Sequence, residues 1–241
     1  MEFFEYALAK ESVVTLYSDK SYSSGLISQI LYGESLVVLE VSGDWIRVKT
    51  VFDDTIGWVS RNQLMTVSET YLGDRKVEVL SEPCVFKEVE QGGMLLSLGS
   101  EIEDLKQIEL EGDLRYRIAA VAKKFVNVPF LKGGRSFFGV DNSSFVQLVF
   151  KASGIKLPLD PEIQSQMGDT LSFVEECQVG DLAFFENSEG MINHVGIMLE
   201  NLRIIHCFGK VRIDQLDSLG IYNIEEKKHS HKLRFIRSLF S

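Results

Sequence analysis

Two histidines have the spacing of a pair that can act together on a proton. His194 begins a strand-like run that ends at Leu199, and His206 follows twelve residues later (206 − 194 = 12), near the end of a second run over Arg203–Phe208. Because side chains alternate across a strand, the two imidazoles can face each other across a hairpin. One would then act as a general base and the other would orient it. The alternative is a pair of structural histidines without a catalytic role.

The stretch FFGVDNSSFVQ predicts the start of a helix. Asp141 is a suitable N-cap, and apolar side chains recur at helical spacing from Phe145 onward. A thiol peptidase holds its nucleophile at such a helix start, because the helix dipole and a nearby imidazole favour the thiolate. This helix start instead carries Asn142, whose carboxamide is not a competent nucleophile, followed by Ser143 and Ser144.

Two kinds of sequence pattern indicate the elements that position these residues. Residues 12–65 contain short β-rich runs between turn signals, which favours a small barrel or sandwich. The runs are Val13–Tyr17, Gln29–Tyr32, Leu36–Val41, Trp45–Thr50 and Gly57–Val59. Beyond residue 117 we expect helices at 117–126 and 142–152 and strands at 182–185, 194–199 and 203–208. Helices followed by antiparallel strands are typical of an α+β domain.

The segment that follows the first β-rich region partly repeats it. Three pairs of blocks occur in the same order: VTLYSD (14–19) with VEVLSEP (77–83), LYGESLVVLE (31–40) with LSLGSEIEDL (96–105), and SGDWIRV (42–48) with EGDLRYRI (111–118). The second copy has no counterpart of the GWV that ends the first. An internal repeat of this kind indicates two related β modules, of which the second is incomplete. We therefore expect three domains, at 1–67, 68–117 and 118–241.

Composition narrows the classes of function. The formal net charge is −10 and the pI is near 5.0, which argues against a nucleic-acid-binding protein. No stretch approaches the roughly 18 apolar residues of a transmembrane helix. The sequence from Met1 lacks the pattern of a signal peptide, so a cytoplasmic location is expected. The oligomeric state is left open.

Cysteines and the remaining histidines give no sign of a metal or cofactor site. Cys84, Cys177 and Cys207 are odd in number, lie far apart and lack zinc-ligand spacing. The sequence therefore predicts no disulfide framework, no metal and no cofactor. His229 and His231 lie in a charged segment, EEKKHSHKLR, where solvated side chains are expected.

The C-terminal half resembles the NlpC-type cell-wall cysteine peptidases, which have a papain-like fold. The resemblance covers about residues 118–241 and includes GGRSFFGVD, GIKLP, GDLAFF, HVGI and IIHCFG. Residues 12–65 resemble a bacterial Src-homology-type barrel through YGESLVVLEVSGDWIRV and GWV. Two such barrels before a peptidase module resemble enzymes that cut γ-D-glutamyl to diamino-acid bonds in cell-wall peptides. The resemblance implies an α+β chain with a papain-like C-terminal domain behind two small β-barrel modules, the second degenerate.

The same resemblance implies roles for individual residues. It places the family's base at His194 and its orienting residue at His206. The family nucleophile is the cysteine of an Asp-Cys-Ser-Gly motif, and this chain reads Asp141-Asn142-Ser143-Ser144, so Asn142 stands at the nucleophile position. The substrate-cleft candidates are Phe130, Asp141, Ser143, Ser144, Leu159, Asn193 and Thr55. Five of them replace the residues usual in the family: Phe130 and Thr55 replace tyrosine, Ser144 glycine, Leu159 arginine and Asn193 threonine.

These departures favour a catalytically inactive or strongly impaired relative of the γ-D-glutamyl-L-diamino-acid endopeptidases. Such a protein would bind a peptidoglycan-derived peptide or a protein partner in a retained cleft, with no nucleic acid and no transmembrane segment involved. One alternative is an active hydrolase that uses Ser143 as its nucleophile. The other is a protein-interaction scaffold whose papain-like module has no binding role.

Overall fold

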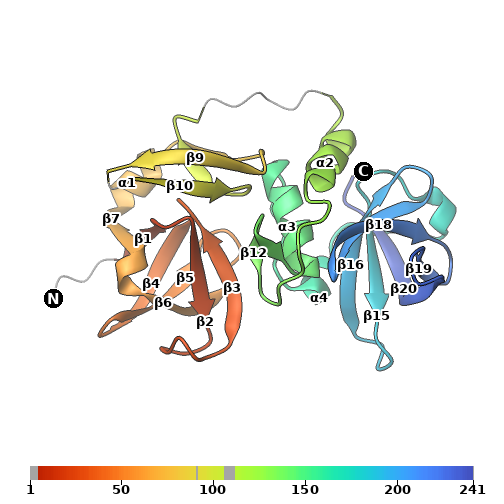
Figure 1. Ribbon diagram of the computed structural model, residues 1–241, viewed down its shortest axis with the longest axis horizontal. Helices are drawn as coiled ribbons and strands as arrows, with labels where there is room; N and C mark the ends of the chain where they lie inside the picture. Colours follow the sequence, from red (N-terminus) through yellow and green to blue (C-terminus); the bar gives the residue numbers. More distant parts are fainter. Residues whose placement is uncertain (1–4, 91, 106–111, 241) are drawn as a thin grey trace. The chain divides into compact units, whose positions relative to one another are not determined.

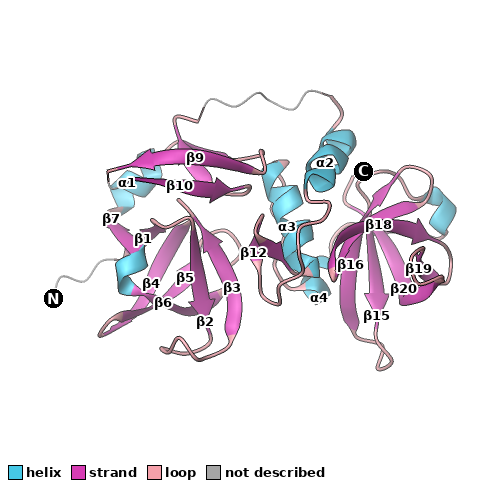
Figure 2. Cartoon of the chain, in the orientation of Figure 1, coloured by secondary structure: helices cyan, strands magenta, loops and turns pink. Residues whose placement is uncertain are grey.

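The computed structural model describes residues 5–90, 92–105 and 112–240, and it divides into two compact units (Figures 1 and 2). The first contains Met1–Ile108 and Leu131–Gly139, and the second contains Glu109–Phe130 and Val140–Ser241. The expected boundary between residues 117 and 118 falls inside helix α2 (Leu114–Lys124). The short segment 131–139 belongs to the first unit although residues on both sides belong to the second.

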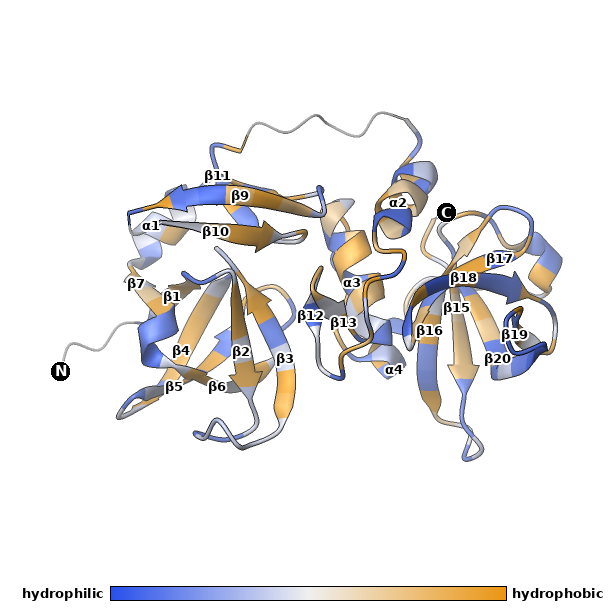
Figure 3. Cartoon of the chain, viewed as in Figure 1, coloured by the Kyte–Doolittle hydropathy of each residue, from blue (hydrophilic) through white to orange (hydrophobic). Residues whose placement is uncertain are grey.

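The first unit contains a seven-stranded antiparallel sheet in the order β3-β2-β6-β5-β4-β1-β7. Its strands are β1 (Tyr6–Ala9), β2 (Val13–Tyr17), β3 (Leu26–Leu31), β4 (Ser35–Ser42), β5 (Trp45–Thr50), β6 (Ile56–Ser60) and β7 (Leu64–Val67), with a 3-10 turn at Arg61–Gln63. Alternating apolar side chains such as Val14, Leu16 and Ile46 form its buried core. Hydrophobic residues, coloured orange, recur along these strands in Figure 3. The five expected strands are all present, whereas β1 and β7 were not predicted.

The rest of the first unit repeats half of that sheet. After α1 (Glu69–Asp74) come β8 (Val77–Val79), β9 (Cys84–Val89), β10 (Gly92–Ser97) and β11 (Glu101–Glu103). Strand β8 pairs with β11 and β9 with β10, as β1 pairs with β4 and β2 with β3. A short strand pair, β12 (Arg135–Ser136) and β13 (Gly139–Val140), lies further along the chain.

This pairing corrects the alignment of the repeat blocks. The Gly33 N–H donates to the carbonyl of Ala9, and the Gly99 N–H donates to the carbonyl of Leu80. Both glycines have a left-handed backbone, with φ of 80° and 94°, so the blocks 31–40 and 96–105 do correspond. Block 14–19, however, lies in β2, whose counterpart is β9 and not the block 77–83. Block 111–118 begins outside the described residues and continues into a helix, so it matches no strand.

The second unit packs helices against an antiparallel sheet. The helices are α2, α3 (Asn142–Ala152) and α4 (Pro161–Gln164), with a 3-10 turn at Val174–Glu176. The strands are β14 (Asp169–Thr170), β15 (Leu182–Glu186), β16 (Ile192–Leu199), β17 (Arg203–Phe208), β18 (Lys210–Leu216), β19 (Gly220–Asn223) and β20 (Lys228–Ser238). Because β20 pairs with both β15 and β19, strands β15 to β20 close into a ring. The expected helices and the three expected strands of this half are present.

Helix α3 is positioned by its cap and by its burial. The Asp141 carboxylate accepts the Ser144 N–H at 2.8 Å, and the Ser144 hydroxyl accepts the Asp141 N–H at 3.1 Å, which forms a capping box. Residues 143–151 are buried, and α3 packs against β16 and β17. The start of the helix is thereby held against the strands that carry His194 and His206. No helix in the described part of the chain is long and apolar enough to cross a membrane.

Candidate active site

Three side chains from adjacent strands form a buried hydrogen-bonded chain. His194 Nε2 lies 2.9 Å from His206 Nδ1, and His206 Nε2 lies 3.1 Å from Asp214 Oδ2. The three residues come from β16, β17 and β18, and none is more than 3% exposed. Gly196 pairs with His206, and a Cβ atom there would lie 2.9 Å from the His206 Cβ. The glycine therefore allows the strand that carries His206 to approach closely.

Asp214 is held ionised by its neighbours. Burial alone would raise the pKa of this carboxyl, but hydrogen bonds from His206 and Arg212 outweigh burial and hold its pKa far below the usual range. Arg212 donates to both carboxylate oxygens, through Nε at 2.5 Å and Nη2 at 3.0 Å. An ionised carboxylate only accepts hydrogen bonds, so His206 Nε2 carries the proton and donates it. Sequence reasoning missed Asp214, although its place in the alternating run VRIDQL, eight residues after His206, was the available signal.

These contacts fix the protonation of His194. Burial lowers the pKa of His206 and, with repulsion from His206 and His231, lowers the pKa of His194 well below its ordinary value. Both rings are therefore neutral at neutral pH. Because His206 Nδ1 has no proton, it accepts from His194 Nε2, and the lone pair of His194 resides on Nδ1. The arrangement supplies an oriented neutral base.

The start of α3 brings Asn142 beside this chain. The Asn142 carboxamide donates from Nδ2 to the carbonyl of Asn193, the residue before His194, at 3.3 Å. The neighbouring hydroxyls are used at the helix start itself. Ser143 Oγ donates to Asp141 Oδ1 at 3.4 Å, and Ser144 Oγ belongs to the capping box. Asn142 thus contacts the residue before His194, and His194 contacts His206 directly, while their roles as nucleophile position, base and orienting residue stay predictions.

The other cleft candidates lie in different surroundings. Phe130 is 44% exposed and forms a bridge with Val140, Asn193 is exposed, and Leu159 is partly buried. Thr55 belongs to the first unit, where its N–H donates to Thr50 Oγ1 at 2.9 Å. Their contribution to a cleft stays a prediction.

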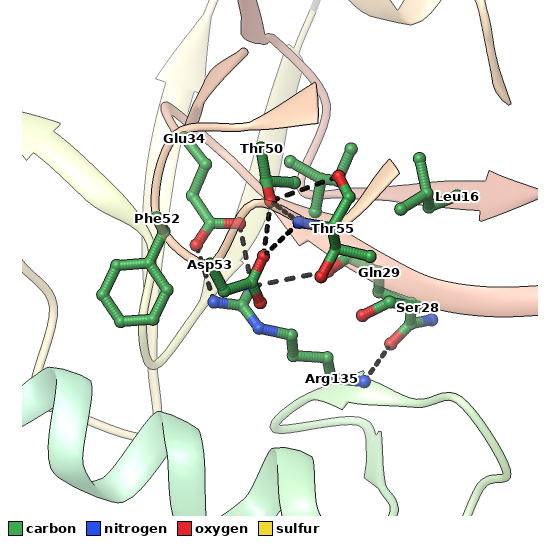
Figure 4. A pocket seen from close by; sticks show the side chains of 10 residues that line it. Leu16, Ser28, Gln29, Glu34, Thr50, Phe52, Asp53, Thr55 and Arg135 are labelled. Carbon is green, nitrogen blue, oxygen red and sulfur yellow. Dashed lines mark hydrogen bonds and ion pairs between the residues drawn. The ribbon is translucent and has the colours of Figure 1, made fainter. Parts of the chain in front are cut away.

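Thr55 lines a polar pocket that is filled by an arginine of the 131–139 segment (Figure 4). The Arg135 guanidinium binds both oxygens of Glu34, at 2.8 and 2.9 Å, and the Arg135 N–H donates to Gln29 Oε1 at 2.8 Å. Its guanidinium carbon also lies 5.6 Å from the Phe52 ring centre. Only about 10 Å³ of the pocket remains open, so the guanidinium occupies it. The ion pair attaches the segment to the barrel of the first unit.

A third histidine packs on the site. His231 stacks on His194 with ring centres 4.0 Å apart, and it lies 5.8 Å from His206. The expectation of a solvated side chain was wrong for His231, which is half-buried, and burial with repulsion from His206 lowers its pKa to about 4. The cause is a bulge: Ile221 pairs with His231 and Tyr222 with His229, so Ser230 is the extra residue. His229 is exposed and contacts Asp217 instead, as its charged surroundings indicated.

Neither cysteine of the second unit has an activated thiol. Cys207 faces away from the histidines and donates from Sγ to the Val140 carbonyl at 3.4 Å, and burial raises its pKa to about 12. Burial also raises the pKa of Cys177 to about 11. Neither residue replaces the thiolate of a cysteine peptidase.

Two family models match different parts of the chain. Residues 127–226 match the NlpC/P60 family model, and residues 16–64 match the bacterial dipeptidyl-peptidase Sh3 domain. The chain is 26% identical to a γ-D-glutamyl-L-lysine dipeptidyl-peptidase of Bacillus subtilis (strain 168), over 89% of this chain and 81% of that protein. It is 22% identical to dipeptidyl-peptidase 6 of Lysinibacillus sphaericus, over 88% and 92%. A crystal structure of an NlpC/P60 family protein from Bacillus cereus ATCC 10987 superimposes with a TM-score of 0.81 at 19% identity, covering 97% of this chain and 99% of that one.

Proposed function

We propose that the chain binds, without hydrolysing them, peptides of the kind on which γ-D-glutamyl-L-lysine dipeptidyl-peptidases act. The chain carries an NlpC/P60 family domain of papain-like fold behind an SH3-like domain, and it is homologous to those enzymes. The bound class would be short cell-wall peptides that contain a γ-D-glutamyl bond to a diamino acid. A protein partner in the same cleft is the second form of the proposal.

One observation supports the proposal: the residue at the helix start beside the histidine chain is asparagine and not cysteine. His194, His206 and Asp214 form an intact chain that leaves a lone pair on His194. The residue at the helix start beside it is Asn142, which has no ionisable proton to give to that base. Loss of the nucleophile in a comparable hydrolase costs on the order of a millionfold in turnover. Peptide binding depends on other contacts and does not require the thiol.

The first experiment separates binding from hydrolysis. L-Ala-γ-D-Glu-L-Lys is incubated with the full chain, and the products are measured by mass spectrometry while binding is measured by calorimetry. We expect saturable binding of the peptide without products. Cleavage that disappears in His194→Ala would refute the loss of activity, and absence of both binding and cleavage would refute the peptide-binding proposal.

The second experiment restores the thiol. In Asn142→Cys the introduced thiol stands at a helix N-terminus beside the neutral His194, so its pKa should fall and its alkylation should be at least tenfold faster than that of exposed Cys84 in the same chain. Cys177 and Cys207 are internal controls, because their raised pKa values keep them protonated. Alkylation of the introduced thiol no faster than that of Cys84 would show that His194 does not serve this position.

The Ser143 alternative has less support. The Ser143 hydroxyl donates to Asp141 at the cap, and the residue is 7% exposed. An active serine would react with a fluorophosphonate probe, and peptide mapping would place the label on Ser143. The pure-scaffold alternative is favoured if the peptide fails to bind while a partner protein does.

A further inference from the structure

Three imidazoles converge at the edge of the candidate site, and the proposed function uses only two of them. One ring nitrogen from each of His194, His206 and His231 lies within 4.8 Å of the other two. They come from three strands, β16, β17 and β20, so all three imidazoles are held by the sheet. His194 and His206 are buried, whereas His231 is half-buried and gives access from solvent.

The surroundings of this cluster match those of a histidine metal site. His206 donates its Nε2–H to the buried Asp214 carboxylate, which leaves Nδ1 directed toward His194. A carboxylate on the far nitrogen of a ligating histidine is the usual outer-shell support, because it fixes the ring and its tautomer. Phe185 and Phe208 pack on His231, with ring centres 6.0 and 5.0 Å away, and provide an apolar wall.

From this geometry we propose that His194, His206 and His231 bind one divalent transition-metal ion of the zinc class. Imidazole nitrogen is a preferred ligand of Zn²⁺, and three histidines with one open position form a recurrent zinc site. The open position would be taken by water or by an oxygen of a bound ligand. Metal binding at these residues does not require that the chain also binds peptides.

The required movement is small and falls on the least buried of the three rings. Tetrahedral zinc with Zn–N distances near 2.1 Å places its nitrogens about 3.4 Å apart. The 2.9 Å contact between His194 and His206 must therefore open by about 0.5 Å, and a separation of up to 4.8 Å must close by at most about 1.4 Å. Rotation of the half-buried His231 beside the Ser230 bulge supplies the closure.

Protons balance without an external acid or base. Before binding, His194 Nε2 carries the proton that it shares with His206 Nδ1. When the metal binds both of these nitrogens, that proton moves to His194 Nδ1, which is the unprotonated nitrogen of the neutral ring. No net proton leaves the three imidazoles, and the metal takes the place of one N–H···N hydrogen bond.

The test measures Zn²⁺ binding to the full chain, without an affinity tag and after dialysis against a chelator. Zn²⁺ is titrated against a chromophoric competitor, and bound metal is counted by mass spectrometry after gel filtration. His231→Ala removes one ligand outside the His194–His206–Asp214 chain. His229→Ala is the matched control, because His229 lies on the same strand and contacts Asp217 instead.

We expect one Zn²⁺ per chain in the wild type and in His229→Ala, and at least tenfold weaker binding in His231→Ala. Co²⁺ in the same site should give the visible absorption of a four-coordinate ion, and that band should be lost in His231→Ala. Circular dichroism and the urea midpoint in chelator establish that both variants are folded.

Three outcomes would overturn the proposal. The first is a wild type that binds no Zn²⁺ at tens of micromolar. The second is equal Zn²⁺ affinity in the wild type and in His231→Ala, and the third is a loss of Zn²⁺ affinity in His229→Ala equal to that in His231→Ala. A six-coordinate Co²⁺ spectrum with unchanged affinity in His231→Ala would place the ion elsewhere on the chain.

Discussion

Replacing Arg135 by methionine should destabilise the first unit by about 3 kcal/mol, because the change removes the guanidinium that binds both carboxylate oxygens of buried Glu34. Arg135 and Glu34 have side-chain exposures of 3% and 4%, and two hydrogen bonds join them. Breaking a buried pair from one side typically costs about 3–5 kcal/mol. We expect the lower end, since Glu34 keeps the hydrogen bond from the Leu31 N–H at 2.8 Å.

The double variant isolates the pair from the cavity. Removing both charges in Glu34→Gln/Arg135→Met takes away the carboxylate that Arg135→Met alone leaves buried, so it should recover at least about 1.5 kcal/mol relative to Arg135→Met. Lys49→Met is the matched control. It breaks the exposed pair with Asp54, whose side chains are 37% and 67% exposed, and should cost less than about 1 kcal/mol.

The assay is urea unfolding followed by tryptophan fluorescence. The chain has two tryptophans, Trp45 in β5 and Trp58 in β6, so the signal reports on the first unit. Hydrogen exchange at the Leu31 amide gives a local measurement of the same contact. An Arg135→Met variant that costs no more than Lys49→Met would refute this prediction. So would a double variant destabilised by the sum of the two single changes, Arg135→Met and Glu34→Gln.

Two further predictions concern the second unit. Gly196→Ala would place a Cβ atom 2.7 Å from the Ile204 Cδ1 and should lower the free energy of unfolding by about 1–3 kcal/mol, measured by circular dichroism in urea. The control Gly73→Ala, which has open space around it, should not lower it. Stability in chelator should fall as the pH drops from 6.5 toward 4, because burial lowers the pKa of His231 to about 4 and also lowers the pKa values of His194 and His206. The unfolded chain takes up these protons first, and above pH 6.5 the three histidines contribute no pH dependence. Partial exposure limits the contribution of His231 to the pH dependence of the free energy of unfolding to about half of the full 1.36 kcal/mol per pH unit. His231→Gln should remove this contribution, and an unchanged slope of stability against pH in that variant would contradict the prediction.

Much of the fold follows from local patterns in the sequence. The strand at Trp45–Thr50 was predicted within its observed bounds, as was the helix at 142–152, because alternating and helical apolar patterns are strong there. Motifs placed His194 and His206 on neighbouring strands, and a hydrogen bond joins them. These features depend on residues that are close in sequence or on a short hairpin.

What the sequence did not predict depends on distant contacts. His231 reaches the site only because Ser230 forms a bulge in a strand whose partners, β15 and β19, lie on either side of it. Arg135 looks like one basic residue in a glycine-rich loop, yet it pairs with Glu34, which is 101 residues away in sequence. Alternation identifies the faces of a strand but gives neither the bulges nor the pairing order of a closed sheet.

The two proposals make different demands on the same imidazoles, and this connects them. A working thiol peptidase needs the lone pair of His194 for its nucleophile, so a metal ion held by His194 and His206 would oppose catalysis. With Asn142 at the helix start, no thiol competes for His194, and the imidazoles are available as ligands. His194 cannot activate the introduced thiol of Asn142→Cys and hold Zn²⁺ at the same time. Added Zn²⁺ should therefore suppress the alkylation of that thiol. Alkylation unaffected by bound Zn²⁺ would instead mean that the metal does not use His194.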